Sequence, residues 1–434
     1  MTRWVDPRGN GNAADSISSR VISDALDRRE APVIPMRPGA GKPAHRSPVD
    51  VLHDEVMQPT ASYRERAIRP KGTGYLAYRY NVADLVTIGS QIALPELELF
   101  RAPWLGKDLD IEIRVGKVGH ASPRARARLL RFEGPPGVRY EEHLGRLGAN
   151  FAIDLGDRIH ITLSRLLARS PHVAYTNVLE ALLRCAIAAK GGMLLHSACV
   201  EIDGRGVMLS ARTDTGKTGT VLRLLRDTGA KFLSDDMTIL YPDGTACYFP
   251  KPLTISVHTL RAVDPGDMSR GEWLVLGLKS RLHSKGGRGI GMAMGEVNLP
   301  IVTANAVTQM LVPPPKYHAD RLVACQLTPQ TQATEMFILE RGRPAVTDVG
   351  IADAIDELVD NTDDAYGFPP FRYLAPVLVV GGQEYQRLRQ REREVLAVAL
   401  STMRVRRITS DCFGWADEIP QLLSGGRGST GPLR

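Results

Sequence analysis

The sequence predicts an α/β fold, and three observations predict it. An apolar strand beginning at Val207 runs into a short polar loop and then into an amphipathic helix. A second apolar strand, Lys231–Leu240, is interrupted by two adjacent acids. Residues 71–175 contain several short runs in which apolar side chains recur at a period near two, which is typical of β-strands. These patterns predict a β-rich segment followed by a core of strands and helices.

The loop after the first strand ends in Gly216-Lys217-Thr218 and has the strand, loop and helix order of a phosphate-binding P-loop. A glycine lets the backbone approach phosphate oxygens, and the helix N-terminus favours an anion. Lys217 would reach the terminal phosphates, and the Thr218 hydroxyl would bind Mg²⁺. The predicted nucleotide-binding residues are Ala211, Arg212, Thr213, Asp214, Thr215, Gly216, Lys217 and Thr218.

One position departs from the P-loop pattern GxxxxGK[ST]. Ala211 stands where the motif has its first glycine, which alanine can replace if its φ stays negative. A polar turn that binds nothing is the alternative interpretation. The helix that must follow is predicted by apolar residues at helical spacing and by a C-terminal cap at Thr228-Gly229. These apolar residues are Val221, Leu222, Leu224 and Leu225.

The second strand carries Asp235 and Asp236 side by side. Adjacent strand residues face opposite sides, so one carboxylate could hold a metal ion while the other faces an acceptor. Buried acids are costly without partners, so the pair predicts a cation, a lysine or a shifted pKa nearby. Lys251 is a candidate second cation. The alternative is a strand end whose acids face water.

The run Leu195–Ser210, the P-loop and the run Gly229–Asp236 together resemble the catalytic domain of HPr kinase/phosphorylase. In that family a histidine precedes a small hairpin, a P-loop follows on the next strand, and an Asp-Asp pair comes a short helix later. The segment Gly287–Gly291 is similar to the family's Arg-Gly-x-Gly signature, with a flexible glycine-rich loop as the alternative. The resemblance covers about residues 190–295 and implies a phosphoenolpyruvate-carboxykinase-like P-loop nucleotide-binding core.

The resemblance also implies roles for single residues. ATP and Mg²⁺ would be the cofactors, with Thr218 and Asp236 as metal ligands. The catalytic set would be Asp235, Asp236, His196 and Arg288. The residues themselves leave open which aspartate is the base and which the metal ligand. His196 would tune the acids, although a histidine in an apolar strand is otherwise a core residue, and Arg288 would stabilise transferring charge.

Three departures leave the acceptor undetermined. Ala211 replaces glycine, Arg212 stands where the family usually has an acid, and the family's His-Gly pair is His196-Ser197 here. We therefore expect an ATP- and Mg²⁺-dependent kinase that phosphorylates a hydroxyl group of a small-molecule or lipid-linked alcohol. One alternative is an HPr-type protein serine kinase/phosphorylase. The other is a non-catalytic nucleotide-sensing scaffold.

Composition limits the partners. The 43% hydrophobic and 24% charged fractions are those of an ordinary globular protein, and no apolar run reaches membrane-spanning length. The start of the chain lacks an apolar core segment, so the expected compartment is the cytoplasm.

The net charge of +7 permits contact with an anionic membrane surface, but no motif that reads nucleic acid accompanies it. Five dispersed cysteines argue against disulfides and zinc, and a homo-oligomer is possible.

The chain is expected to divide into five segments. A poorly ordered arm spans residues 1–70, a β-rich domain, expected to be antiparallel, spans 71–175, and a P-loop kinase-like domain spans 176–345. A C-terminal α/β extension, 346–423, contains a helix at 383–401, a strand at 403–408 and a helix at 415–423, and a flexible tail spans 424–434. A helix at 177–189 is expected to pack on the P-loop domain. The stiff segment 313–321 could shape the acceptor pocket or form a rigid surface turn.

Overall fold

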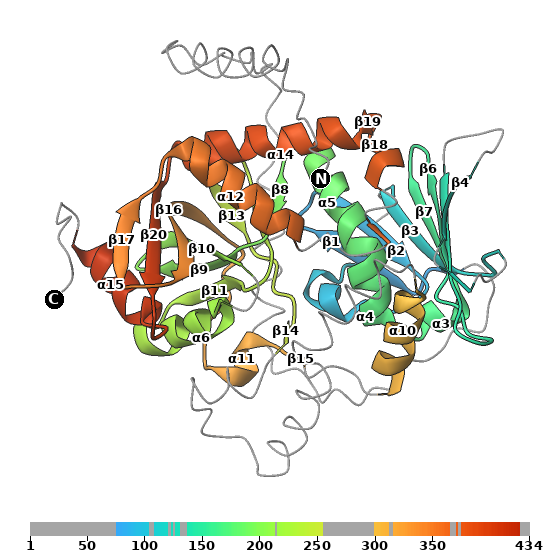
Figure 1. Cartoon of the computed structure of the whole chain (residues 1–434), viewed down its shortest axis with the longest axis horizontal. Coiled ribbons are helices and arrows are strands. Elements are labelled where there is room, and N and C mark those ends of the chain that lie inside the picture. Colours follow the sequence, from blue (N-terminus) through green and yellow to red (C-terminus); the bar gives the residue numbers. More distant parts are fainter. Residues whose placement is uncertain are drawn as a thin grey trace, which may run out of the picture. The chain divides into compact units, whose positions relative to one another are not determined.

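The structure is a computed structural model with a mixed α/β fold (Figure 1). The chain divides into two units, Met1–Glu65 and Arg66–Arg434, of which the second is compact. The residues that the structure describes all belong to the second unit; they are 75–103, 108–119, 123–124, 126–130, 137–212, 215–254, 299–311, 316–364, 370–371 and 375–425. The predicted arm and most of the predicted tail lie outside this set, as do Thr213, Asp214 and Arg288.

The β-rich segment forms a seven-stranded sheet in the order β1-β2-β3-β7-β6-β5-β4. The expectation of an antiparallel sheet is wrong for the central strands. There β2 pairs with β3, and β3 with β7, in parallel. The 3₁₀ helix η1 (Pro95–Phe100) lies in a crossover between β2 and β3, so this connection is not a hairpin. The strands are β1 (Tyr78–Val82), β2 (Val86–Ser90), β3 (Ile111–Val115), β4 (Arg126–Leu130), β5 (Gly137–Glu141), β6 (Phe151–Leu155) and β7 (Ile159–Leu163).

The second sheet contains the P-loop and has nine strands. At its centre β16 pairs in parallel with both β10 and β20, so the C-terminal segment completes the sheet that carries the P-loop. The strands are β8 (Met193–Leu195), β9 (Ala198–Ile202), β10 (Arg205–Ala211), β11 (Lys231–Ser234), β12 (Thr238–Leu240), β13 (Thr245–Cys247), β16 (Gln330–Arg341), β17 (Ala345–Asp348) and β20 (Arg404–Ser410).

Helices cover both faces of this sheet. Neighbouring residues of β10 belong to different core clusters, because successive strand side chains face opposite ways. Leu209 packs with α6 (Lys217–Thr228) and α15 (Trp415–Ser424), and Met208 packs with α12 (Ile351–Asp364) and α14 (Tyr385–Leu400). The predicted helices and the predicted glycine cap are confirmed, since Gly229 ends α6 in the left-handed conformation with φ +66°.

A helical segment lies between the two sheets (Figure 1). It consists of α4 (Pro171–Ala174), the π turn η2 (Tyr175–Leu179) and α5 (Glu180–Ala189), and it follows α3 (Arg165–Ala168). One core cluster joins residues of α5 to Ile113 of β3 and Ile239 of β12. The helix thus packs on the P-loop domain as expected, but it also contacts the first sheet and so joins the two. Nearly every residue of α5 is buried, as expected for a helix enclosed on all sides.

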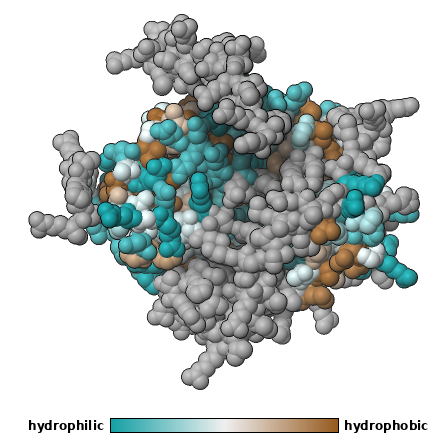
Figure 2. All heavy atoms as spheres, in the orientation of Figure 1, coloured by the Kyte–Doolittle hydropathy of each residue, from teal (hydrophilic) through white to brown (hydrophobic). Residues whose placement is uncertain are grey.

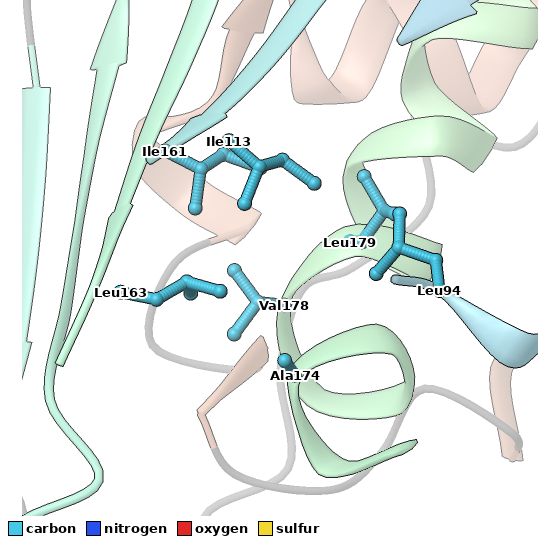
Figure 3. A pocket seen from close by; sticks show the side chains of 7 residues that line it. All are labelled: Leu94, Ile113, Ile161, Leu163, Ala174, Val178 and Leu179. Atoms are coloured by element: carbon cyan, nitrogen blue, oxygen red, sulfur yellow. The ribbon is translucent and has the colours of Figure 1, made fainter. Parts of the chain in front are cut away.

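The contact between the first sheet and this helix is closed and apolar. Figure 3 shows the side chains that meet there: Leu94, Ile113, Ile161, Leu163, Ala174, Val178 and Leu179. The space they enclose has no room for a water molecule, so it is core packing. It contributes to the rigid placement of α4 and α5, which carry polar residues of the site described below.

The remaining elements are short and lie around these layers. They are β14 (Leu253–Thr254), α10 (Ile301–Leu311), β15 (Lys316–Tyr317), α11 (Ala319–Leu322), η3 (Ala375–Val377), β18 (Val379–Val380) and β19 (Gln383–Glu384). Figure 2 shows hydrophobic side chains around α10, where Met310 and Leu311 are exposed. Among the residues that the structure describes, no helix is long and apolar enough to cross a membrane.

Candidate functional site

The loop between β10 and α6 is closed by its own hydrogen bonds. The backbone N–H and the hydroxyl of Thr215 both donate to the carbonyl oxygen of Arg212, at 3.2 and 2.8 Å. Ala211 ends β10 with a negative φ, which is the condition under which alanine can replace the first glycine of the motif. Gly216 has φ +129°, and a Cβ there would lie 2.7 Å from Cδ1 of Phe413. Glycine is therefore needed at 216 both for its conformation and for lack of space.

A side chain from β16 supports this loop. The Nε of Arg341 donates to the Thr215 carbonyl at 3.0 Å, and its guanidinium lies 3.3 Å from the centre of the Phe413 ring. Phe413 itself has φ +62°, which is unusual for a bulky residue. Sequence reasoning did not find this support, because Arg341 and Phe413 lie far along the chain from the P-loop and belong to no motif.

Lys217, Thr218 and Asp235 meet at the start of α6. The Thr218 hydroxyl donates to Oδ2 of Asp235 at 2.7 Å. The other carboxylate oxygen of Asp235, Oδ1, is buried without a hydrogen-bond partner among the described residues, and so is the Nζ of Lys217. Buried polar atoms normally have partners. A donor and an acceptor left unpaired in the same place therefore point to a ligand with negative and positive parts.

Electrostatics agree with this arrangement. Burial lowers the pKa of the Lys217 ammonium, and the charges of Asp236 and Asp235 oppose that effect. Burial raises the pKa of Asp235, against the opposing effects of Lys217 and of the Thr218 hydrogen bond. Each charged group is thus destabilised by its lack of solvation and needs further compensation. A phosphate beside Lys217 and a cation beside Asp235 would supply it.

Asp236 lies in a different environment from Asp235. Both acids follow β11 in a bend rather than within a continuous strand, and the Asp236 side chain is 47% exposed. Its Oδ2 accepts from Lys251 Nζ at 2.7 Å, and its Oδ1 lies 3.5 Å from Nε2 of His196. Burial works against its ionised form, but Lys251 and His196 outweigh it and hold the pKa of Asp236 well below its usual range.

His196 is oriented by α12. Its Nδ1 lies 2.9 Å from the carbonyl oxygen of Asn361, and its backbone N–H donates to the Thr362 hydroxyl at 3.3 Å. A carbonyl oxygen only accepts, so Nδ1 carries the hydrogen and Nε2 faces Asp236. The structure therefore brings together the histidine, the acid pair and the P-loop lysine that were selected from the sequence.

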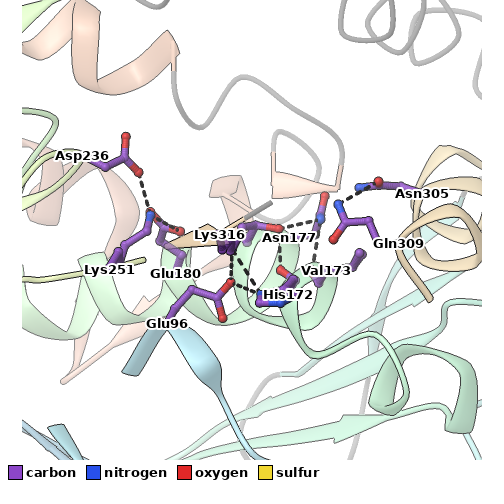
Figure 4. A network of polar contacts seen from close by, with 11 residues as sticks. Glu96, His172, Val173, Asn177, Glu180, Asp236, Lys251, Asn305, Gln309 and Lys316 are labelled. Atoms are coloured by element: carbon purple, nitrogen blue, oxygen red, sulfur yellow. Dashed lines mark hydrogen bonds and ion pairs between the residues drawn. The ribbon is translucent and has the colours of Figure 1, made fainter. Parts of the chain in front are cut away.

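Lys251 connects Asp236 to the helix between the sheets. Its Nζ donates to Glu180 Oε1 at 2.9 Å as well as to Asp236 (Figure 4). The same Nζ lies 5.5 Å from the centre of the Tyr175 ring. The side chain is only 10% exposed. Burial alone would lower the pKa of Lys251, but Asp236 and Glu180 raise it above its usual range. Sequence reasoning named Lys251 but missed Glu180, which lay within a helix whose pattern indicated only packing.

A second polar cluster lies further along the same helix (Figure 4). Oε1 of Glu96, in η1, accepts from both Nδ1 of His172, at 2.6 Å, and Nζ of Lys316. The Glu96 side chain is fully buried, whereas those of His172 and Lys316 are 20% and 15% exposed. We call Glu96, His172 and Lys316 the Glu96 cluster. Burial opposes ionisation of Glu96, but the His172 hydrogen bond and the Lys316 charge lower its pKa to about 2.

The Glu96 cluster predicts a specific dependence of stability on pH. Because the pKa of Glu96 is lower in the folded chain than its ordinary value of 4.5, its stabilising effect is complete above about pH 5 and is lost as the pH falls towards 2. The shift corresponds to about 3 kcal/mol of unfolding free energy. We expect Glu96→Gln to remove this part of the acid destabilisation, measured by urea unfolding from pH 7 to pH 3.

Glu98→Gln is the matched control, because Glu98 lies in the same 3₁₀ helix and forms an exposed ion pair with Arg101. Exposed ion pairs contribute little, so this variant should follow the wild-type pH profile. Identical slopes for Glu96→Gln and the wild type between pH 5 and 3 would contradict the assignment.

Several predicted residues cannot be placed. Arg288, Thr213 and Asp214 lie outside the described residues, whereas Arg212 is placed and its side chain is exposed. Within the described ranges, no group of three or more His, Cys, Asp or Glu side chains is arranged to hold a metal ion. The oxygen atoms grouped at the P-loop are those of Asp235 and Thr218.

Comparisons with known proteins add little to this geometry. No protein family model matches the chain, and no curated protein matches it. Among solved structures, the chain is similar to the Hpr(Ser) kinase/phosphatase from Coxiella burnetii, with 10% sequence identity and a TM-score of 0.22. The match covers 54% of this chain and 94% of that one. The function proposed below therefore rests on the contacts within this chain.

Proposed function

We propose that this chain is an ATP- and Mg²⁺-dependent kinase that transfers the γ-phosphoryl group of ATP to a hydroxyl group. The observation that carries the proposal is the pair of buried, unpartnered atoms at the start of α6, Lys217 Nζ and Asp235 Oδ1. A polar turn that binds nothing would leave both atoms buried at a cost of a few kcal/mol without compensation. The finer assignment, a phosphoenolpyruvate-carboxykinase-like core, rests on the sequence motifs alone.

The site has the atoms that a magnesium nucleotide requires. Mg²⁺ prefers oxygen ligands and is commonly held by one or two carboxylates together with substrate phosphates. The free Oδ1 of Asp235 and the lone pairs of the Thr218 hydroxyl would provide protein ligands on the side of the P-loop. We therefore propose Asp235, rather than the initially expected Asp236, as the aspartate that binds the metal. Bound Mg²⁺ would neutralise charge on the phosphate oxygens.

Because Asp235 would bind the metal, Asp236 is available to contact the acceptor hydroxyl. It is more exposed than Asp235, and Lys251 and His196 fix its two oxygens in place. In the reaction, the acceptor oxygen would form a bond to the γ-phosphorus while the bond from that phosphorus to the β–γ bridging oxygen breaks and ADP leaves. The hydroxyl proton would pass to the Asp236 carboxylate. Because phosphoryl transfer depends mainly on positioning, orientation of the hydroxyl matters more than the strength of this base.

Transfer of label from ATP tests the proposal. The chain is incubated with γ-³²P-labelled ATP and a cell extract, either with Mg²⁺ or with EDTA. We expect the label in a compound other than inorganic phosphate, and only when Mg²⁺ is present. Binding of ATP without any transferred label would contradict the kinase and favour a nucleotide-binding scaffold.

A further inference from the structure

The Glu96 cluster and the contacts of Asp236 lie on one helical segment. His172 is in α4 and Glu180 begins α5, and the π turn η2 separates them. A π turn is wider than an α turn and changes the direction in which later side chains project, and such turns occur frequently at functional sites. Figure 4 shows two groups of polar contacts along this segment: one joins Glu180 through Lys251 to Asp236, and the other joins His172, Glu96 and Lys316.

Each of the two groups contains one lysine, and the two lysines come from neighbouring parts of the fold. Lys251 lies two residues before β14 and Lys316 lies in β15, and these two strands pair with each other. Each lysine contacts a buried acid, Glu180 for Lys251 and Glu96 for Lys316. This pairing places Leu253 opposite Tyr317, so the two lysines lie on neighbouring backbone segments. The Glu96 cluster and the contacts of Asp236 are therefore neighbours both along the helical segment and along this strand pair (Figure 4).

The cluster keeps hydrogen-bond donors that Glu96 does not use. An ammonium has three hydrogens; Lys316 gives one to Glu96, and its Nζ also lies 3.2 Å from Nδ1 of His172, which leaves at least one hydrogen for another partner. The His172 ring donates through Nδ1, which leaves Nε2 for another partner. Both side chains are partly exposed above a carboxylate that is fully buried. Glu96 thus holds two basic groups in fixed positions, which is the preorganisation that recognition of an anion requires.

We propose that the acceptor of this kinase carries an acid group, a carboxylate or a phosphate, and that Lys316 and His172 bind this group while the acceptor hydroxyl lies at Asp236. The inference rests on the proposed function, since it concerns the substrate of the same site. It limits the acceptor to molecules with a negative charge separated from the reacting hydroxyl. A free hydroxy acid and an acidic segment of a protein would both satisfy this chemistry.

Kinetics of acceptor use test the inference. We expect Lys316→Gln and His172→Gln each to raise the apparent KM for the acceptor about ten- to a hundredfold, the effect of losing a charge-assisted hydrogen bond. ATP binding and acceptor-independent ATP hydrolysis should stay within about twofold of wild type, because neither residue contacts the P-loop. Lys190→Gln is the control, since Lys190 also bridges helix and sheet, through Asp110, but lies 40% exposed.

The acceptor is supplied as extract separated into dialysable and retained fractions, each then passed over an anion-exchange resin. The inference predicts that the fraction accepting label binds to the resin. Label acceptance by the dialysable fraction identifies a small acid as the source, and acceptance by the retained fraction identifies a protein. If the wild type transfers label and both variants have an unchanged acceptor KM, the inference is wrong, but the proposed kinase activity is not affected. No transfer by wild type would overturn the kinase itself.

Discussion

Lys217→Ala should reduce phosphoryl transfer by about 10²- to 10³-fold, the cost of removing one donor aimed at developing charge. The Lys217 ammonium is buried, lacks a hydrogen-bond partner among the described residues, and is held near Asp235 and Asp236. Its burial without a hydrogen-bond partner is unfavourable, whereas its charge compensates the buried Asp235. Because these two effects oppose each other, the variant should be about as stable as wild type. Reduced transfer with unchanged or raised stability is the combination that a functional residue gives and a structural residue does not. The measurements are steady-state label transfer and thermal unfolding of the same preparations.

Lys231→Ala is the matched control. Lys231 begins β11, the strand that leads to Asp235, but its side chain is 46% exposed and pairs with Glu201 at 2.8 Å. Loss of this exposed pair should change neither activity nor stability appreciably. If Lys217→Ala and Lys231→Ala retain the same activity, the P-loop does not hold the transferred phosphate.

Local patterns were enough to predict the parts of the site that are close in sequence. Gly216, Lys217 and Thr218 form a strand-to-helix turn whose order alone predicts its chemistry, and Gly229 ends the helix as its conformational freedom allows. The periodicity of the C-terminal segment likewise predicted α14, β20 and α15 close to their observed bounds. These features depend on residues close together in the chain, so they can be predicted from a single sequence.

Long-range pairing was not predictable in the same way. The parallel centre of the first sheet depends on the crossover through η1, which no alternation of apolar residues shows. The acid pair was placed within one strand, but the chain bends there, because β11 and β12 pair with different neighbours. Glu96, Glu180 and Lys316 come from three distant segments, and only the fold brings Glu180 to Lys251 and Glu96 to Lys316. Contacts between such distant residues follow no fixed spacing, so they could not be predicted from the sequence.

The two aspartates should respond differently to neutralisation. Asp235→Asn removes the carboxylate beside Thr218, so Mg²⁺-dependent binding of a non-hydrolysable ATP analogue should weaken at least tenfold. Asp236→Asn leaves that carboxylate in place, so the analogue should bind as in wild type. Label transfer should fall by about 10²- to 10⁴-fold, because the variant loses the group that orients the acceptor hydroxyl and accepts its proton. Calorimetric titration with and without Mg²⁺ measures the first effect, and transfer at saturating ATP measures the second.

Asp227→Asn is a suitable control, because Asp227 lies at the far end of α6 in an exposed pair with Arg226. The contrast between the two variants follows from their surroundings. Asp235 is buried against the P-loop with one free oxygen, whereas Asp236 faces solvent and is held by Lys251 and His196. If Asp236→Asn instead abolished the effect of Mg²⁺ on binding and Asp235→Asn preserved it, the roles would be exchanged, and the metal would lie on the His196 side of the site.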